Sequence, residues 1–224
     1  MSERPIFIPT LNDIKLVETI MVEFNWFSGF SKVQKQKSIR SLHEEAKKTN
    51  NIENILEIST KSEKTIGVKA SAFNMIINLK NKQSASVESF YQGSKIFENG
   101  GPYIDLYKKS SLESKKDGRL QLSGNLKGFK FQDENWGIDE NFYDWLYLNA
   151  LIQNKDIANE INKYDAFTDI EFNPKKSYNC QAHTAALFKA LLARNFDLNN
   201  IRSPSSFKKH FPKEQLLNTQ LDLF

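Results

Sequence analysis

Four short stretches of the chain carry the apolar and β-branched residues that are typical of strands. They are residues 14–26, ILEIST at 55–60, MIINLK at 75–80 and TDIEFNP at 168–174. The segment NKQS, which follows the third of them, has the composition of a turn. These stretches predict a few short strands.

Five longer segments have the apolar spacing or the end signals of helices. The first covers 31–48, where Ser31 is a good N-cap. Its partial apolar stripe consists of Val33, Ile39, Leu42 and Ala46. The other predicted helices cover 86–97, 142–154, 155–164 and 179–195. The helix over 86–97 is expected to stop before the Asn-Gly-Gly-Pro sequence at 99–102, because glycine ends a helix and proline prevents its restart.

The balance of these segments predicts a single, mainly α domain with a few short β-strands. A chain of 224 residues is long enough for one large core or two small ones. From residue 197 the sequence is polar and contains two prolines, which favours a tail or linker.

Composition excludes several classes of protein. No run approaches the roughly 20 apolar residues of a membrane span, and MSERPIFIPT lacks the pattern of a signal peptide. The single cysteine, Cys180, cannot form an internal disulfide, and the three histidines are far apart. We therefore expect a cytoplasmic protein without a metal site or cofactor.

The net charge of +4 is modest, but the lysines are clustered. SKVQKQKSIR contains four basic residues, and lysine doublets stand at 108–109, 115–116, 175–176 and 208–209. Such clusters attract phosphates. They are equally typical of a solvated, lysine-rich surface, so charge permits a nucleic-acid partner without showing one.

The segment SVESFYQGSKIF, residues 86–97, places three chemically useful side chains on one face of the predicted helix. Glu88, Gln92 and Lys95 have the spacing i, i+4 and i+7, so an acid, an amide and an amine would line up over two turns. Taken alone, the pattern fits either a solvated surface or a binding site.

Residues 71–97 resemble the start of the NADAR family, whose helix carries the pattern Val-Glu-x-x-Tyr-Gln-x-x-Lys. The matching residues here are Val87, Glu88, Tyr91, Gln92 and Lys95. Further similarities, in chain order, are Trp136, the Gln153-Asn154 end of a helix, DIEFNP and the last helix. The resemblance spans about residues 70–195, and the segment FNWFSGFSKVQKQKS before it resembles the NADAR subgroup of antitoxins to DarT-type toxins.

The resemblance implies an N-glycosidase that removes ADP-ribose from guanine in single-stranded DNA, with a DarT-type toxin as its functional partner. It implies Glu88 and Lys95 as catalytic residues. The substrate-binding residues that it implies are Phe73, Asn74, Tyr91, Gln92, Trp136, Glu171 and Lys176. The corresponding domains are an N-terminal extension packed on the core (1–60), a catalytic core (61–196) and a polar tail (197–224).

One departure from the family pattern affects the third catalytic position. The acidic residue that the family has just after the DIEFNP-like segment is replaced by Lys176. Asp169 and Glu171 are the candidates to substitute for it.

The chemistry of N-glycoside cleavage suits these residue types. Glu88 can move protons, and Lys95 can attack the anomeric carbon to give a Schiff base if its environment lowers its pKa. Alternatively, Lys95 only holds a phosphate. Tyr91 and Trp136 would stack on base faces, although aromatic residues also serve simply as core anchors. Two other functions stay open, a non-catalytic binder of ADP-ribosylated nucleic acid or toxin, and an N-glycosidase of small metabolites.

The last five residues, QLDLF, resemble the peptide by which bacterial repair proteins bind the DNA sliding clamp. Leu221, Leu223 and Phe224 would fill an apolar groove, and Gln220 would bond in a polar subsite. The alternative is that these apolar residues fold back onto the domain.

Overall fold

The computed structural model describes residues 2–11, 15–175, 177 and 179–211. Within them the chain forms two compact units. Unit 1 consists of residues 2–71 and 155–197, and unit 2 of residues 72–154 and 198–211. The domain boundaries proposed above stay a prediction.

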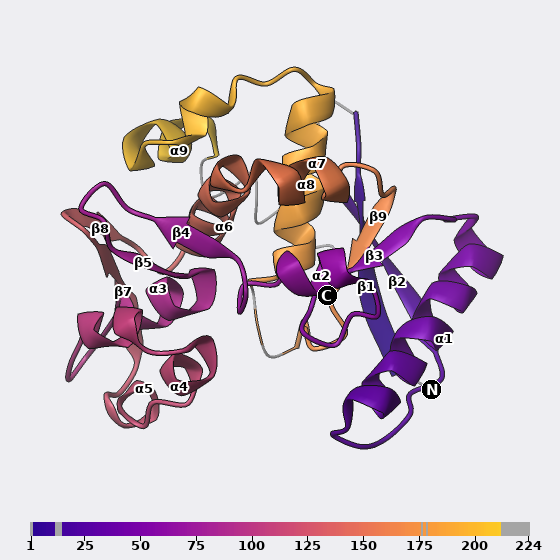
Figure 1. The fold of residues 1–224 in the computed structure, drawn as a ribbon, viewed down its shortest axis with the longest axis horizontal. Helices are drawn as coiled ribbons and strands as arrows, with labels where there is room; N and C mark the ends of the chain where they lie inside the picture. The colour runs from indigo at the N-terminus through magenta and orange to yellow at the C-terminus, as the bar shows by residue number, and fades with distance from the viewer. Residues whose placement is uncertain (1, 12–14, 176, 178, 212–224) are drawn as a thin grey trace. The chain divides into compact units, whose positions relative to one another are not determined.

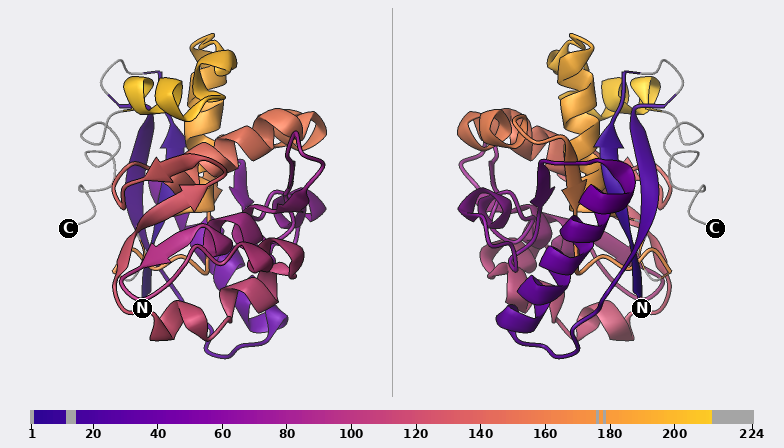
Figure 2. Two further views of the ribbon diagram at one scale, coloured as in Figure 1. Left: turned by 90° about the vertical axis from the view of Figure 1, so that its left-hand side faces the viewer. Right: turned by 90° about the vertical axis from the view of Figure 1, so that its right-hand side faces the viewer.

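Unit 1 is built on a four-stranded sheet with the order β2-β1-β9-β3. The strands are β1 (Ser2–Pro9), β2 (Val17–Phe24), β3 (Ile55–Glu57) and β9 (Ala166–Thr168). β1 and β2 pair antiparallel along their whole length, from Ser2 opposite Phe24 to Pro9 opposite Val17. Both views of Figure 2 show these two strands side by side. β3 and β9 pair parallel, which joins segments more than a hundred residues apart in the chain.

The helices of unit 1 are α1 (Lys32–Asn50), α2 (Thr65–Lys69), α7 (Lys155–Ile161) and α8 (Gln181–Ala193). α1 lies across the β1–β2 hairpin (Figure 1). It starts as predicted, because the Ser31 hydroxyl accepts a hydrogen bond from the backbone N–H of Gln34 at 3.3 Å.

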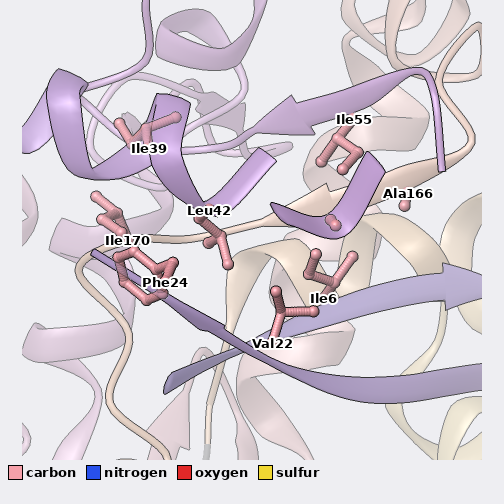
Figure 3. Close-up of a cluster of buried hydrophobic side chains, with 9 residues drawn as sticks. Ile6, Val22, Phe24, Ile39, Leu42, Ile55, Ala166 and Ile170 are labelled. Atoms are coloured by element: carbon pink, nitrogen blue, oxygen red, sulfur yellow. The ribbon is translucent and has the colours of Figure 1, made fainter. Parts of the chain in front are cut away.

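The sheet of unit 1 is covered on both faces, because successive side chains of a strand point to opposite sides. Ile6 packs with Ile39 and Leu42 of α1 in a cluster of buried apolar residues (Figure 3). The next residue, Phe7, instead meets the ring of His183 in α8, with centroids 5.4 Å apart. This two-sided burial fixes the register of β1.

Unit 2 contains a two-stranded and a three-stranded sheet with short helices between them. Its strands are β4 (Ile76–Asn78), β5 (Ser84–Ser86), β6 (Lys95–Phe97), β7 (Leu126–Phe131) and β8 (Glu134–Trp136). Its helices are α3 (Val87–Gly93), η1 (Ile104–Lys108), α4 (Ser111–Lys115), α5 (Arg119–Leu122), α6 (Phe142–Gln153), η2 (Leu198–Ile201) and α9 (Pro204–His210), with η marking 3₁₀ helices. All of these elements lie within the described ranges.

The end of α6 holds the β4–β5 hairpin in unit 2. The side-chain oxygen of Gln153 accepts a hydrogen bond from the backbone N–H of Asn78 at 2.9 Å. The amide of Asn154 donates to the carbonyl of Ile76 at 2.8 Å. Gln153 and Asn154 therefore fix strand β4, from which the chain continues through β5 into α3.

The predicted mainly α fold is wrong. The structure is an α/β fold, with sheets of four, two and three strands among the described residues. β1 was not expected at all, and several strands have only three residues, too few for a clear alternating pattern. The strands expected within 14–26, 55–60 and 75–80 are confirmed as β2, β3 and β4, whereas the strand expected over 168–174 is wrong, because β9 already ends at Thr168.

Two further expectations change. The helix predicted over 86–97 ends at Gly93, and Lys95–Phe97 is strand β6. Within the predicted polar tail, α9 is an ordered helix whose Phe207 is fully buried. No described helix is long and apolar enough to cross a membrane.

Candidate active site

Helix α3 brings the first candidate catalytic residue, Glu88, into unit 2 at a well-anchored helix start. The hydroxyl of Ser86 caps the helix by accepting a hydrogen bond from the Ser89 N–H at 3.0 Å. The N–H of Glu88 donates to the carbonyl of Ala72, also at 3.0 Å. Since the first N–H groups of a helix have no partner within it, these bonds fix the position of the first turn.

Glu88 and Gln92 form a buried pair on α3. Their side chains are 6% and 7% exposed, and the Gln92 Nε2 donates to the Glu88 Oε1 at 2.9 Å. This bond fixes the orientation of the amide, so Oε1 of Gln92 is the remaining acceptor. That oxygen is buried and meets no donor among the described residues. Buried polar atoms are normally paired, so this acceptor is available for an N–H or O–H of a ligand.

Lys95 is placed by β6 rather than by the helix. It pairs with Phe129 of β7 in the sheet, and its Nζ lies 4.8 Å from the centroid of the Tyr91 ring. Burial lowers the pKa of Lys95 from 10.5 to about 8. The negative charge of Glu88 opposes this shift, and the positive charge of Lys115 adds to it. Lys95 is therefore partly neutral near physiological pH.

The loop before β4 forms another part of this site. The Ser111 hydroxyl donates to the carbonyl of Phe73 at 2.6 Å, and the Nζ of Lys115 lies 5.1 Å from the Phe73 ring centroid. Phe73 is half-buried, whereas Asn74 is exposed. Lys115 was not expected from the sequence, since a lysine doublet gives no sign of which charge faces the site.

Trp136 lies in the aromatic core of unit 2. It is 3% exposed and packs against Phe142 and Trp145, with ring centroids 5.3 and 5.1 Å apart. The Nζ of Lys208 lies 4.5 Å from its ring centroid. The Tyr91 ring is connected to the same cluster, 6.3 Å from that of Phe142. The stacking of either ring on a base stays a prediction.

The structure places Glu88, Tyr91 and Gln92 on α3 and Lys95 on β6, all in unit 2, and their catalytic and binding roles stay predictions. Glu171 belongs to unit 1, where it is exposed and forms an ion pair with Lys35 at 3.2 Å. Lys176 lies outside the described residues. The four clamp-binding candidates Gln220, Leu221, Leu223 and Phe224 also lie outside them, so their roles stay predictions.

Unit 1 contains a buried carboxylate that sequence reasoning missed, Glu57. Its two oxygens accept hydrogen bonds from the Thr168 hydroxyl at 2.7 Å and the Ile170 N–H at 2.9 Å. Burial raises the pKa of Glu57. The Nε2 of His43 is 2.8 Å from the Thr168 hydroxyl, and burial lowers the pKa of His43 to about 4. Because that hydroxyl donates to Glu57, it accepts from a neutral His43.

Asp169 lies beside Glu57 in the same unit and is also buried. It accepts hydrogen bonds from the Gln181 amide at 2.8 Å and the Glu171 N–H at 3.0 Å. Burial and the neighbouring charge of Glu57 raise its pKa. The sequence contains one signal for Glu57, which is an acidic residue between the apolar residues of a short strand. A carboxylate that is buried in this way needs hydrogen-bond or charged partners, and this need marks the position. Its proximity to Asp169 follows from the parallel β3–β9 pairing, which spacing alone does not reveal.

A model of the DarT1-associated NADAR antitoxins matches residues 2–221. The chain belongs to that family. The match includes both units and the N-terminal segment that precedes the core pattern. NADAR proteins are generally N-glycosidase-like enzymes, and the antitoxin family implies a cognate DarT toxin as partner. A comparison with curated proteins finds no match.

Proposed function

We propose that this NADAR antitoxin is a hydrolase that cleaves the N-glycosidic bond between ADP-ribose and guanine in DNA, and so reverses the modification made by a DarT-type toxin. The observation that carries the proposal is the arrangement on α3 and β6. A buried acid–amide pair, Glu88 and Gln92, lies near a lysine whose pKa is lowered to about 8.

In the proposed reaction, the neutral amine of Lys95 attacks the anomeric carbon of the ADP-ribose. The bond from that carbon to the guanine nitrogen breaks, and guanine leaves with one proton of the amine. The bond from the same carbon to the ring oxygen then breaks and that oxygen takes the second proton, so that the opened sugar remains attached to Nζ as a Schiff base. Water then hydrolyses the imine, which releases ADP-ribose and restores the amine. Glu88 moves the protons between the amine, the guanine nitrogen and water.

Gln92 has two tasks in this scheme. Its amide holds the Glu88 carboxylate in one orientation at 2.9 Å, and its unpaired Oε1 accepts a hydrogen bond from the substrate. Phe73 and Lys115 lie at the same site, where an aromatic ring beside a cation suits a base next to a phosphate. These features support a nucleotide-like substrate.

The test is the release of ADP-ribose from a single-stranded oligonucleotide that carries ADP-ribose on guanine. We expect release by the wild type and a loss of at least a hundredfold, on the order of one general acid–base contribution, in Lys95→Ala and Glu88→Gln. Lys116→Ala is the matched control, because this exposed lysine lies next to Lys115 and is expected to keep full activity. Circular dichroism melts would establish that every variant is folded.

Each outcome has a definite meaning. Tight binding without release by the wild type would make the protein a reader of the modification and overturn the hydrolase. Release only from small ribosylated metabolites would move the substrate class away from DNA.

Reduction with borohydride during turnover separates the two roles considered for Lys95. A Schiff base would be reduced to a stable adduct on Lys95, detectable by peptide mass spectrometry. Turnover without an adduct would leave Lys95 as a phosphate contact.

A further inference from the structure

A group of aromatic and basic side chains precedes and begins helix α1 in unit 1; all of them are exposed except Trp26, which is half-buried against the core cluster. We call it the loop–α1 surface and define it by Trp26, Phe27, Phe30, Lys32 and Lys37. The Phe30 side chain is 99% exposed and that of Phe27 is 39% exposed. A fully exposed phenylalanine gains nothing from the hydrophobic effect in folding, so its position is not explained by the core.

The backbone of the loop is fixed to α1 by hydrogen bonds. The N–H of Asn25 donates to the Ser41 hydroxyl at 3.1 Å, and the N–H of Phe27 donates to the Ser38 hydroxyl at 3.0 Å. Ser31 then caps α1. The exposed rings are therefore presented from an anchored loop, which lowers the entropy cost of binding.

The charge of this surface is entirely positive along the chain. From residue 24 to 43 the sequence has four lysines and arginines and no acidic residue. Lys35 pairs with Glu171 and Arg40 with Glu63. In contrast, Lys32 and Lys37 form no ion pair within the part of the chain that the structure describes.

The basic and aromatic groups are also interleaved in space. The Nζ of Lys35 lies 4.5 Å from the Trp26 ring centroid, and the guanidinium of Arg4 lies 5.2 Å from it. The Nζ of Lys37 lies 6.0 Å from the ring centroid of Phe27. The pair of Lys37 and Phe27, both exposed, places a cation for a phosphate next to a ring for a base.

We propose that the loop–α1 surface binds single-stranded nucleic acid. Exposed rings stack on unpaired bases irrespective of sequence, and lysines follow the backbone phosphates. In a duplex the bases are already stacked on one another, so Phe30 would have no partner there. The identification of this strand as DNA flanking the modified guanine rests on the proposed function, but the binding itself does not.

The experiment measures the affinity of the full chain for an unmodified, fluorescently labelled single-stranded oligonucleotide by anisotropy at several salt concentrations. Phe30→Ala is expected to weaken binding about 5- to 150-fold, the range for loss of one base stack. The double variant Lys32→Gln, Lys37→Gln is expected to weaken binding and to reduce the salt slope by about 1.4.

Matched controls come from elsewhere in the chain. The double variant Lys47→Gln, Lys48→Gln changes two lysines at the other end of α1, and Leu122→Ala removes a side chain that is 84% exposed in unit 2. Both are expected to leave the affinity within about twofold, on the scale of surface substitutions. Thermal melts would show that all variants fold.

Three results with oligonucleotides would overturn the proposal. They are no binding by the wild type, equal losses in the control variants, and equal affinity for a blunt duplex. A loss of affinity for the toxin rather than the oligonucleotide in Phe30→Ala would also overturn it, since the surface would then bind protein. Because the oligonucleotide is unmodified, a failure of the hydrolase assay leaves this result unaffected.

Discussion

Lys95 should titrate far below an ordinary lysine, and this can be tested without assuming any reaction. Its pKa is lowered from 10.5 to about 8, chiefly by burial. At pH 7 a lysine with a pKa of 8 is neutral in about one molecule in ten, whereas an ordinary lysine is neutral in about three in ten thousand. The site therefore holds about 300 times more reactive amine at neutral pH.

Two neighbouring charges should move this pKa in opposite directions. Lys115→Gln removes a positive charge that disfavours protonation, so the pKa of Lys95 should rise. Glu88→Gln removes a negative charge that favours protonation, so the pKa of Lys95 should fall further. Lys116→Gln, at the adjacent exposed position, is the control and should leave the titration in place.

The measurement is an NMR titration after reductive ¹³C-methylation of the lysines, with the Lys95 signal assigned by its absence in Lys95→Arg. If release of ADP-ribose is observed, its rate should also rise about tenfold per pH unit below 8 and level off above it. A Lys95 signal that titrates near 10.5 would refute the reasoning. Equal shifts in Lys115→Gln and Lys116→Gln would refute the assignment of the neighbouring charge.

Two predictions concern stability. Phe207→Ala should cost about 3–5 kcal/mol in urea denaturation, because Phe207 is fully buried and packs against Trp136; a cost near zero would mean that α9 is not part of the folded unit. Glu57→Gln should gain stability relative to wild type as the pH rises above about 4.5, because burial raises the pKa of Glu57 in the folded state and ionisation then opposes folding. Paired melts at pH 5 and 7.5 would check this, and a difference that is independent of pH would contradict it.

Local sequence signals predicted the longer helices well but missed the short ones, such as α2, α4 and α5. α1 begins after Ser31, whose hydroxyl makes the expected cap, and α6 and α8 occupy the segments with strong apolar content. Each depends on interactions within a few residues, which a single sequence displays directly. The fold class was wrong because sheets depend on pairing between distant segments. Nothing near β3 or β9 indicates that these strands, each of three residues, pair with one another.

In the candidate site, too, local contacts could be predicted from the sequence and contacts between distant segments could not. Glu88 and Gln92 are four residues apart on a helix, and their hydrogen bond follows from that spacing. The continuation of the helix to Lys95 was wrong, because tertiary contacts end it earlier. The Ser94 hydroxyl bonds to the Phe90 carbonyl and to Tyr107, and the chain then joins β7 as β6. These contacts cannot be predicted from the spacing of apolar residues in 86–97.

The environment of Lys95 favours one of the two roles proposed for it. A pKa lowered from 10.5 to about 8 means that the charged form is destabilised in the folded protein by about 3.5 kcal/mol, at roughly 1.4 kcal/mol per pKa unit. Within the described residues its Nζ has no carboxylate at ion-pair distance, and the charge of Glu88 and the cation–π contact with Tyr91 only partly offset its burial. A phosphate contact works best with a permanently charged amine, which an ordinary pKa provides. A nucleophile needs the neutral amine, which burial provides. The cost in stability therefore favours the proposed nucleophile over the phosphate contact, and borohydride trapping tests that choice.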